Sequence, residues 1–195
     1  HGDAIQTIIL PPAEKTGGKG VMEALALRRS SRSFAREPLS PAVLSDLLWA
    51  AFGVNRPDGG RTAPSALGAQ EVDVYLALPS GAYLYDSEAH ALRLVAGSDV
   101  RRVTGYQDFV DEAPLDLVFV ADHSRMRMVP AGERERFAWC AAGAIAQNVY
   151  LYCASAGLAA VIRAWIDREA IARALGLSHD QQVLLSQTVG LPSAD

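Results

Sequence analysis

The chain has 195 residues, of which 50% are hydrophobic and 21% are charged, and its formal net charge is −4. This composition is typical of a globular protein, and the length allows one domain with a sizeable core. The acidic balance argues against a general nucleic-acid-binding protein, which carries a basic face, but allows a local basic pocket for one small anion. No window reaches the roughly 18 uninterrupted apolar residues of a membrane-spanning helix, so we expect no membrane partner either.

The first twenty residues are polar and rich in Gly and Pro, as in PPAEKTGGKG. We expect an extended arm over residues 1–20 that lies on another surface. GGKG is a poor match to a phosphate-binding P-loop, because neither Ser nor Thr follows Lys19 and no strand runs into it. The chain begins with His1 rather than Met, which a tag scar or a removed signal peptide would explain.

Helical patterns cover two segments that follow the arm. Residues 21–29 have helical spacing, with Met22 and Leu25 on one face. A second helix is expected to begin at Pro41, because proline suits the first helical position and Ser40 is a good N-cap.

Apolar segments bounded by turn residues predict the strands. Residues 72–78 alternate, which predicts a strand with one buried face. GAYLYDSEAHALRLV predicts two short strands joined by a turn, and APLDLVFVAD predicts a central strand. Two more strands are expected from LAAVIRAW and VLLSQTVGLP. We find no repeat and no linker, so the pattern favours a single α+β domain.

Residues 133–155 form the longest helical pattern, which is apolar nearly all round after a charged first turn. Such a helix is expected to be buried on all sides. Its amides, Gln147 and Asn148, need partners, either backbone groups or a polar ligand at a subunit seam. Cys140 and Cys153 would lie about 20 Å apart, too far for a disulfide, so we interpret both as buried hydrophobic residues and expect no metal site.

The densest polar motif is RRSSRSF, residues 28–34, with three arginines and three serines. Guanidinium groups match phosphate oxygens and serine hydroxyls add neutral donors, so this motif can hold one phosphate. The alternative is a solvated helix C-terminus, where arginines complement the helix dipole. A second motif, APSA at residues 63–66, is either a plain turn or a loop that brings backbone N–H groups close to a ligand.

Together these segments resemble the FMN-dependent nitroreductase superfamily, most closely its short SagB-type branch of thiazoline/oxazoline dehydrogenases. RRSSRSF is similar to the family element Arg-x-Ser-x-Arg/Lys-x-Phe, and GRTAPSALGAQEVDVYLALP to its loop-and-strand pattern. GAYLYDSEAHAL resembles the SagB-type hairpin, and AAGAIAQNVYLYCASAGLAAVIR resembles the central helix and the strand after it. The motifs follow the family order and span almost the whole chain.

The resemblance implies a mixed, mainly antiparallel sheet flanked by helices, in protomers interlocked as a homodimer. Residues 21–195 would then form one FMN-binding domain, with two FMN sites at the dimer interface. The apolar helix and the arm fit such an interface. A bacterial protein of this kind would lie in the cytoplasm or, after removal of a signal peptide, in the periplasm.

The resemblance also assigns roles to individual residues. The FMN phosphate should be bound by Arg28 and Arg32, with contributions from Arg29 and Ser30. The flavin should be lined from the partner subunit by Pro64, Ser65, Ala66 and Leu67, and Asn148 is expected near it. The segment along the flavin ring should be Val161, Ile162, Arg163 and Ala164. A backbone N–H of Arg163 or Ala164 is expected to face flavin N5.

The chain also departs from the family pattern. No Lys or Arg follows Arg173, so the two phosphate-binding arginines would carry most of the charge. Arg163 either tunes the flavin or binds an anionic substrate, or else it is a surface arginine at a strand end. Candidates for lining the substrate pocket are Trp165, Tyr83, Tyr85 and Tyr106.

Three functions are compatible with these residues. The first is an FMN-dependent oxidoreductase that passes hydride from NAD(P)H through flavin N5 to a small acceptor, such as a nitroaromatic or a quinone. The second is an azoline peptide dehydrogenase of SagB type. The third is a non-catalytic flavin-binding dimer. The first needs no side-chain acid or base, in agreement with the lack of a clear catalytic dyad.

Overall fold

The computed structural model describes residues 6–194 of the chain. Residues 1–5 of the expected arm and residue 195 lie outside them. The helices are α1 (Val21–Leu27), α2 (Pro41–Phe52), α3 (Ala131–Ala156) and α4 (Arg168–Leu175). The strands are β1 (Thr7–Ile9), β2 (Val72–Leu78), β3 (Gly81–Asp86), β4 (Ala91–Ala96), β5 (Leu115–Asp122), β6 (Ala159–Arg163) and β7 (Gln181–Gly190).

The strands form one sheet of seven in the order β1-β4-β3-β2-β5-β7-β6. Every pairing between them is antiparallel, so the sheet is more uniform than the mixed sheet that the resemblance implies. The apolar strand β5 is central, as expected from its sequence, with β2 on one side and β7 on the other. β6 is an edge strand, so one row of its backbone groups is open to other partners.

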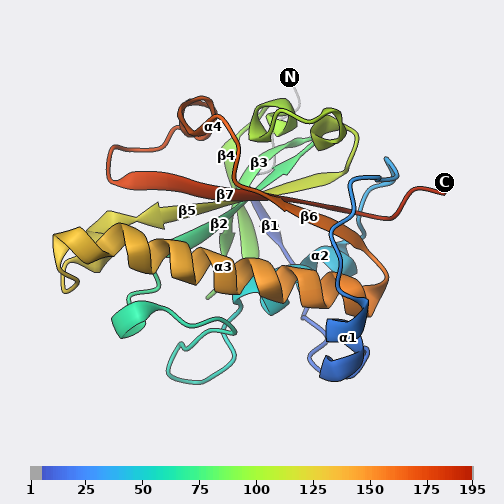
Figure 1. Cartoon of the computed structure of the whole chain (residues 1–195), viewed down its shortest axis with the longest axis horizontal. Helices are drawn as coiled ribbons and strands as arrows, with labels where there is room; N and C mark the ends of the chain where they lie inside the picture. The colour runs from blue at the N-terminus through green and yellow to red at the C-terminus, as the bar shows by residue number, and fades with distance from the viewer. Residues whose placement is uncertain (1–5, 195) are drawn as a thin grey trace.

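Helices cover both faces of the sheet, as Figure 1 shows, with α3 lying across one face and α4 on the other. Leu76 and Phe119 belong to the core beneath α2 and α3. Tyr75 and Val118 point the other way and pack against Ile171 of α4. β2 is therefore buried on both faces, and the prediction of one buried face was wrong because α4 covers the second.

Local capping follows the sequence signals. The Ser40 side chain accepts a hydrogen bond from Val43 N, and Pro41 begins α2. α3 ends at Gly157, whose φ of 72° lies in the left-handed region that glycine adopts easily. α1 ends at Leu27, two residues earlier than expected, which leaves Arg28 as its C-cap.

The expected arm packs on its own chain. β1 pairs with β4 at the edge of the sheet. Further along, Glu14 N donates to Asp46 of α2, and Lys19 N donates to Ser155 of α3. The arm then leads into α1, whose Met22 and Leu25 are 78% and 45% exposed. The apolar face of α1 therefore has no cover within residues 6–194.

α3 is not buried on all sides, contrary to its sequence pattern. Its inner face packs on the sheet, but an outer stripe is exposed, made of Arg136, Cys140, Gly143 and Gln147. Cys140 is thus not a buried residue, whereas Cys153 is. No helix within residues 6–194 has the length and apolar character needed to cross a membrane. The same residues contain no His, Cys, Asp and Glu cluster suited to a metal.

Candidate functional site

The RRSSRSF segment leaves α1 in an extended conformation and is anchored to α3 and β6. The Arg28 guanidinium lies over the Tyr150 ring, 5.1 Å from its centroid. The Ser30 hydroxyl is 2.8 Å from the Tyr150 hydroxyl. Ser31 N donates to Ala160 O of β6 at 2.9 Å. The basic segment is therefore held against the open edge of β6.

The arginines of this segment are not neutralised by acidic side chains. Arg28, Arg29 and Arg32 form no ion pair with any residue between 6 and 194, whereas Arg101 and Arg125 do. Arg29 turns to a separate cavity of about 390 Å³, which it lines with Lys19 and others. In a chain of net charge −4, these arginines therefore stand out as a local concentration of uncompensated positive charge.

The open edge of β6 continues from the basic segment. Ala160 and Ile162 direct their backbone groups away from β7, since Ala160 O accepts from Ser31 and Ile162 N donates to Tyr150. Backbone groups alternate between the two edges of a strand, so Ala164 continues this row and Arg163 faces β7. Arg168 donates to Ala164 O at 2.7 Å and so fixes the peptide group between Ala164 and Trp165.

Tyr150 is the residue that joins these parts, and sequence reasoning did not identify it. Its hydroxyl contacts Ser30 and accepts from Ile162 N, both at 2.8 Å. A signal was present, because a tyrosine in an apolar helix needs a partner for its hydroxyl group.

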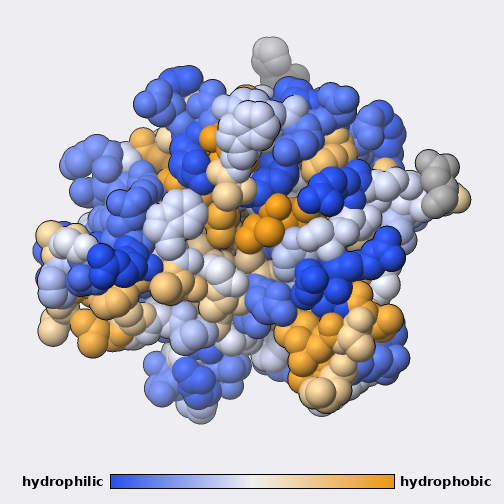
Figure 2. All heavy atoms as spheres, viewed as in Figure 1, coloured by the Kyte–Doolittle hydropathy of each residue, from blue (hydrophilic) through white to orange (hydrophobic). Residues whose placement is uncertain are grey.

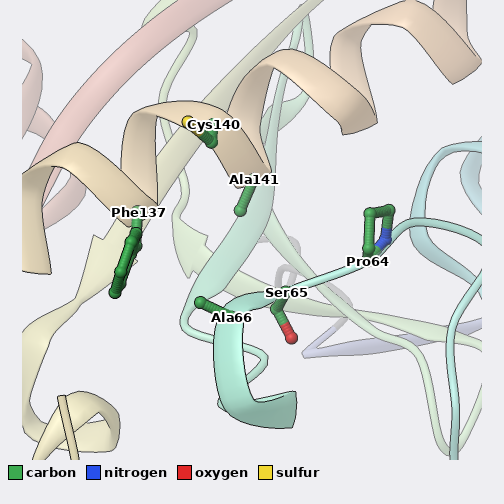
Figure 3. A pocket seen from close by; sticks show the side chains of 6 residues that line it. All are labelled: Pro64, Ser65, Ala66, Phe137, Cys140 and Ala141. Carbon is green, nitrogen blue, oxygen red and sulfur yellow. The ribbon is translucent and has the colours of Figure 1, made fainter.

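The loop of residues 64–67 lies against the other flank of α3. Pro64, Ser65 and Ala66 line a cavity of about 280 Å³ together with Phe137, Cys140 and Ala141 of the helix. Figure 3 shows Ala141 pointing from α3 toward this loop. Leu67 has a φ of 54°, in the left-handed region, and is 75% exposed. Such a conformation is rare for leucine and is found at ligand sites.

The structure does not bring the two predicted halves of the site together within one chain. Asn148 turns toward the loop flank, where its amide donates to Ala51 O and Thr62 O, both at 3.3 Å. Tyr150 turns toward the β6 flank. Asn148 therefore satisfies backbone groups, and Gln147 is exposed on the stripe between the two flanks.

Comparison with known proteins decides the family. The family model described as "Nitroreductase family" matches residues 25–191. The chain belongs to the nitroreductase family. MJ1384 of Methanocaldococcus jannaschii, which carries a nitroreductase name, is 31% identical over 179 residues, 86% of this chain and 88% of its own. A crystal structure from Ralstonia eutropha JMP134, also named for a nitroreductase, is 51% identical with a TM-score of 0.95, covering 100% of this chain and 93% of its own.

More distant nitroreductase-fold structures share the architecture. The NADPH:FMN oxidoreductase of Vibrio harveyi, complexed with NAD⁺, has a TM-score of 0.65 at 22% identity, covering 89% of this chain and 69% of its own. The microcin synthetase McbBCD complex of Escherichia coli has a TM-score of 0.74 at 21% identity, covering 83% of this chain and 67% of its own. At these identities the likeness shows the fold alone, and the α+β nitroreductase fold is confirmed.

Arg163 is neither the surface arginine nor the anion-binding residue that its position at the end of β6 allowed. It is 5% exposed, and its Nη2 donates to Asp116 at 3.2 Å, Ser186 at 3.0 Å and Thr188 at 2.6 Å. Complete burial raises the pKa of Asp116, although the Arg163 charge acts in the opposite direction. Arg163 is therefore a buried structural cation, neither at the surface nor free to bind an anionic substrate.

The aromatic residues predicted to line the substrate pocket fall into two groups, one buried and one exposed. Tyr83 and Tyr85 are buried in the core of the nitroreductase fold, so they do not line a pocket. Tyr106 is 54% exposed and Trp165 is 77% exposed. Only the latter two remain candidates for contact with a substrate.

Proposed function

We propose that this chain is an FMN-dependent oxidoreductase that passes hydride from NAD(P)H to a small acceptor, such as a nitroaromatic or a quinone. The observation that carries the proposal is the basic segment, with three arginines lacking acidic partners, anchored beside the open edge of β6. Such an arrangement suits a ligand with a phosphate at one end and a flat ring at the other.

The residues present fit FMN. Arg28 and Arg32 would bind the phosphate, with Ser30 beside them, since exposed arginines without carboxylates are available to an anion. Ser31 and Tyr150 already occupy Ala160 O and Ile162 N, so the part of the β6 edge left for the flavin runs from the carbonyl of Ile162 to the N–H of Ala164. Val161 and the residues that follow would run beside the ring.

The geometry of β6 supports one of the two backbone N–H groups that were expected to face flavin N5. When bound, the flavin would supply the redox chemistry, taking hydride at N5 and returning it to the acceptor. Of the two backbone N–H groups expected there, that of Ala164 lies on the open edge, whereas Arg163 faces β7. We therefore assign the N–H that faces N5 to Ala164. The protein binds and orients, and no side-chain acid or base is required.

A homodimer would complete this site. Each chain holds the basic segment on one flank of α3 and the loop of residues 64–67 on the other, so a second copy is needed to bring the two halves together. Figure 2 shows a hydrophobic patch over α1. Its exposed members are Val21, Met22, Leu25 and Leu27. Exposed apolar area of this kind marks protein interfaces.

Known proteins of this fold support the cofactor choice. The Vibrio harveyi structure is named as an NADPH:FMN oxidoreductase and was determined with NAD⁺. A second candidate, an azoline peptide dehydrogenase, is favoured by the likeness to the microcin synthetase complex, which holds a truncated pro-peptide. A non-catalytic flavin-binding dimer is the third.

The first test is the visible absorption spectrum of the purified protein, followed by identification of the flavin released on heating. We expect a yellow protein that releases FMN and consumes NADH or NADPH when a quinone is added. A protein that stays colourless after incubation with FMN would refute the proposal. A flavin-loaded protein without turnover would favour the non-catalytic dimer.

A further inference from the structure

Two large aromatic side chains pack against each other at the surface next to the end of β6. Tyr106 and Trp165 have ring centroids 5.2 Å apart and planes inclined at 49°. Trp165 is 77% exposed, although tryptophan is mostly buried in folded proteins. Two aromatic rings left open to solvent therefore call for a physical explanation.

The backbone beneath Tyr106 is held by two arginines. Arg163 reaches through the interior and donates from Nη1 to Thr104 O. Arg102 donates from Nη2 to Gly105 O at 3.1 Å and also to Gln107 O. The peptide group that precedes the exposed tyrosine is thus fixed, and so are the carbonyl groups of Thr104 and Gln107 nearby.

Gly105 shows how closely this loop approaches the buried arginine. A Cβ added there would lie 1.9 Å from Arg163 Nη1. The Gly105 φ of −175° is ordinary extended backbone, so the glycine is required by the close approach and not by its conformation. Arg163 cannot retreat easily, because Asp116, Ser186 and Thr188 hold its other nitrogen.

The backbone that carries the second ring is also held. Trp165 follows Ala164, whose carbonyl oxygen accepts from Arg168. Arg168 also donates to Leu184 O and lies 5.3 Å from the Trp139 ring centroid of α3. The aromatic pair therefore stands on a rigid base directly beyond the β6 edge assigned to the flavin.

We infer that Tyr106 and Trp165 are specificity-determining residues that stack on the flat ring of an aromatic acceptor, and that Arg163 is the positioning residue that holds the loop of Tyr106. The inference rests on the proposed function, because it places the acceptor beside the flavin. Aromatic faces contribute large contact areas with specific geometry, so the pair favours planar acceptors over non-aromatic ones.

The test is a calorimetric titration that measures the affinity of the oxidised protein for 2-methyl-1,4-naphthoquinone. Trp165→Ala and Tyr106→Ala should each weaken quinone binding about fivefold. Trp165→Phe, which keeps an aromatic face, should restore most of the affinity. Met128→Ala removes an equally exposed hydrophobic residue outside the pair and serves as the control. Equal affinity in all variants, or no binding to the native protein, would overturn the inference.

A second pair of variants tests the positioning role. Because Arg163 cannot retreat easily, Gly105→Ala should shift the loop that carries Tyr106 and weaken quinone binding, whereas Gly97→Ala, where a Cβ would have no atom within 4 Å, should not. Ferricyanide, which has no ring to stack, serves as the acceptor for comparison, and its kcat/KM should stay unchanged in Gly105→Ala. An equal fall with both acceptors would indicate general damage and overturn the positioning role.

Flavin content and molecular mass of the same samples keep this inference apart from the proposed function. A sample without flavin that still binds the quinone through Trp165 would refute the FMN proposal alone. A flavin-loaded sample whose quinone affinity is the same with and without the two rings would refute only the stacking role of Tyr106 and Trp165. If Trp165→Ala dissociates a dimer and leaves quinone affinity unchanged, the pair belongs to a subunit interface and the stacking role is wrong.

Discussion

Two groups of arginines in this chain differ in how their charge is compensated. Arg163 is buried, and a buried charge needs a partner, which Asp116 supplies together with two hydroxyl groups. Arg28 and Arg32 are solvated and can remain without a carboxylate until a ligand arrives. Burial, rather than residue type, separates the structural arginine from the candidate ligand-binding ones.

The solvated arginines can be tested by removing both. Arg28→Ala combined with Arg32→Ala should weaken FMN binding by about 100-fold or more, because two charge-assisted hydrogen bonds are lost. Stability should change by only about 1 kcal/mol, as neither residue is fully buried. A titration followed by the fluorescence of free FMN measures the FMN affinity, and urea unfolding measures the stability. Arg127→Ala combined with Arg173→Ala removes the same charge elsewhere, and FMN affinity lost equally in that control would contradict the assignment.

A hydrogen-bond chain through His90 ties the arm to the hairpin and to α2. Tyr85 OH lies 2.8 Å from His90 Nδ1, and Ser45 Oγ lies 2.7 Å from Nε2. Ser45 donates onward to Pro11 O. Because Ser45 gives its one proton to Pro11 O, Nε2–H of His90 donates to Ser45, and in neutral His90 the Nδ1 atom then accepts from Tyr85.

Acid should therefore weaken the fold through His90. Burial lowers the pKa of His90 below its usual 6.5, so the unfolded chain takes up the proton first. The contribution of neutral His90 is complete above about pH 6.5 and is lost as the pH falls through the lower folded-state pKa. Urea unfolding between pH 7.5 and 5 should show a smaller decline in His90→Asn, which tolerates the φ of 49° at this position. The exposed His179→Asn should retain the native pH dependence, and an unaltered slope in His90→Asn would sink the idea.

At the scale of elements, the contact between α3 and β6 depends on one hydroxyl group. Tyr150→Phe should cost about 1–2 kcal/mol of stability, because Ile162 N loses its acceptor and Ser30 its partner. FMN affinity should fall several-fold as the basic segment loses its anchor. Tyr152→Phe, on the same helix and without a hydrogen bond at its hydroxyl group, is the matched control. Unchanged FMN affinity in Tyr150→Phe would show that Ser30 is positioned by other contacts.

At the scale of the whole molecule, the exposed stripe of α3 and the apolar face of α1 are the surfaces through which the proposed homodimer would form. Gly143 lies on this stripe, and a Cβ added there would have no atom of residues 6–194 within 4 Å. Gly143→Glu should therefore fold as well as the native protein but form monomers that lose flavin. Light scattering measures the mass, and Ala42→Glu, an exposed substitution on α2, is the control. A Gly143→Glu protein that remains dimeric would move the interface away from α3.

Much of the fold could be predicted from the sequence because the decisive signals are local. The caps at Ser40 and Gly157 act within a turn of their own helices, and the apolar run of β5 implies a central strand wherever the chain folds. The order of four motifs along the chain is enough to identify the family. The basic residues of the candidate site were predicted in the same way, since RRSSRSF is a contiguous segment.

Only the tertiary structure could decide which residues meet. Cys140 and Cys153 look alike in sequence, but one faces solvent and the other the sheet. The arginine at the end of β6 becomes a buried cation because β5 and β7 bring Asp116 and Thr188 to it. The hydroxyl of Tyr150 gains its role from two segments distant in sequence. Composition and periodicity determine how much of a chain is buried, whereas long-range packing determines which polar groups are paired inside and which remain free for a ligand.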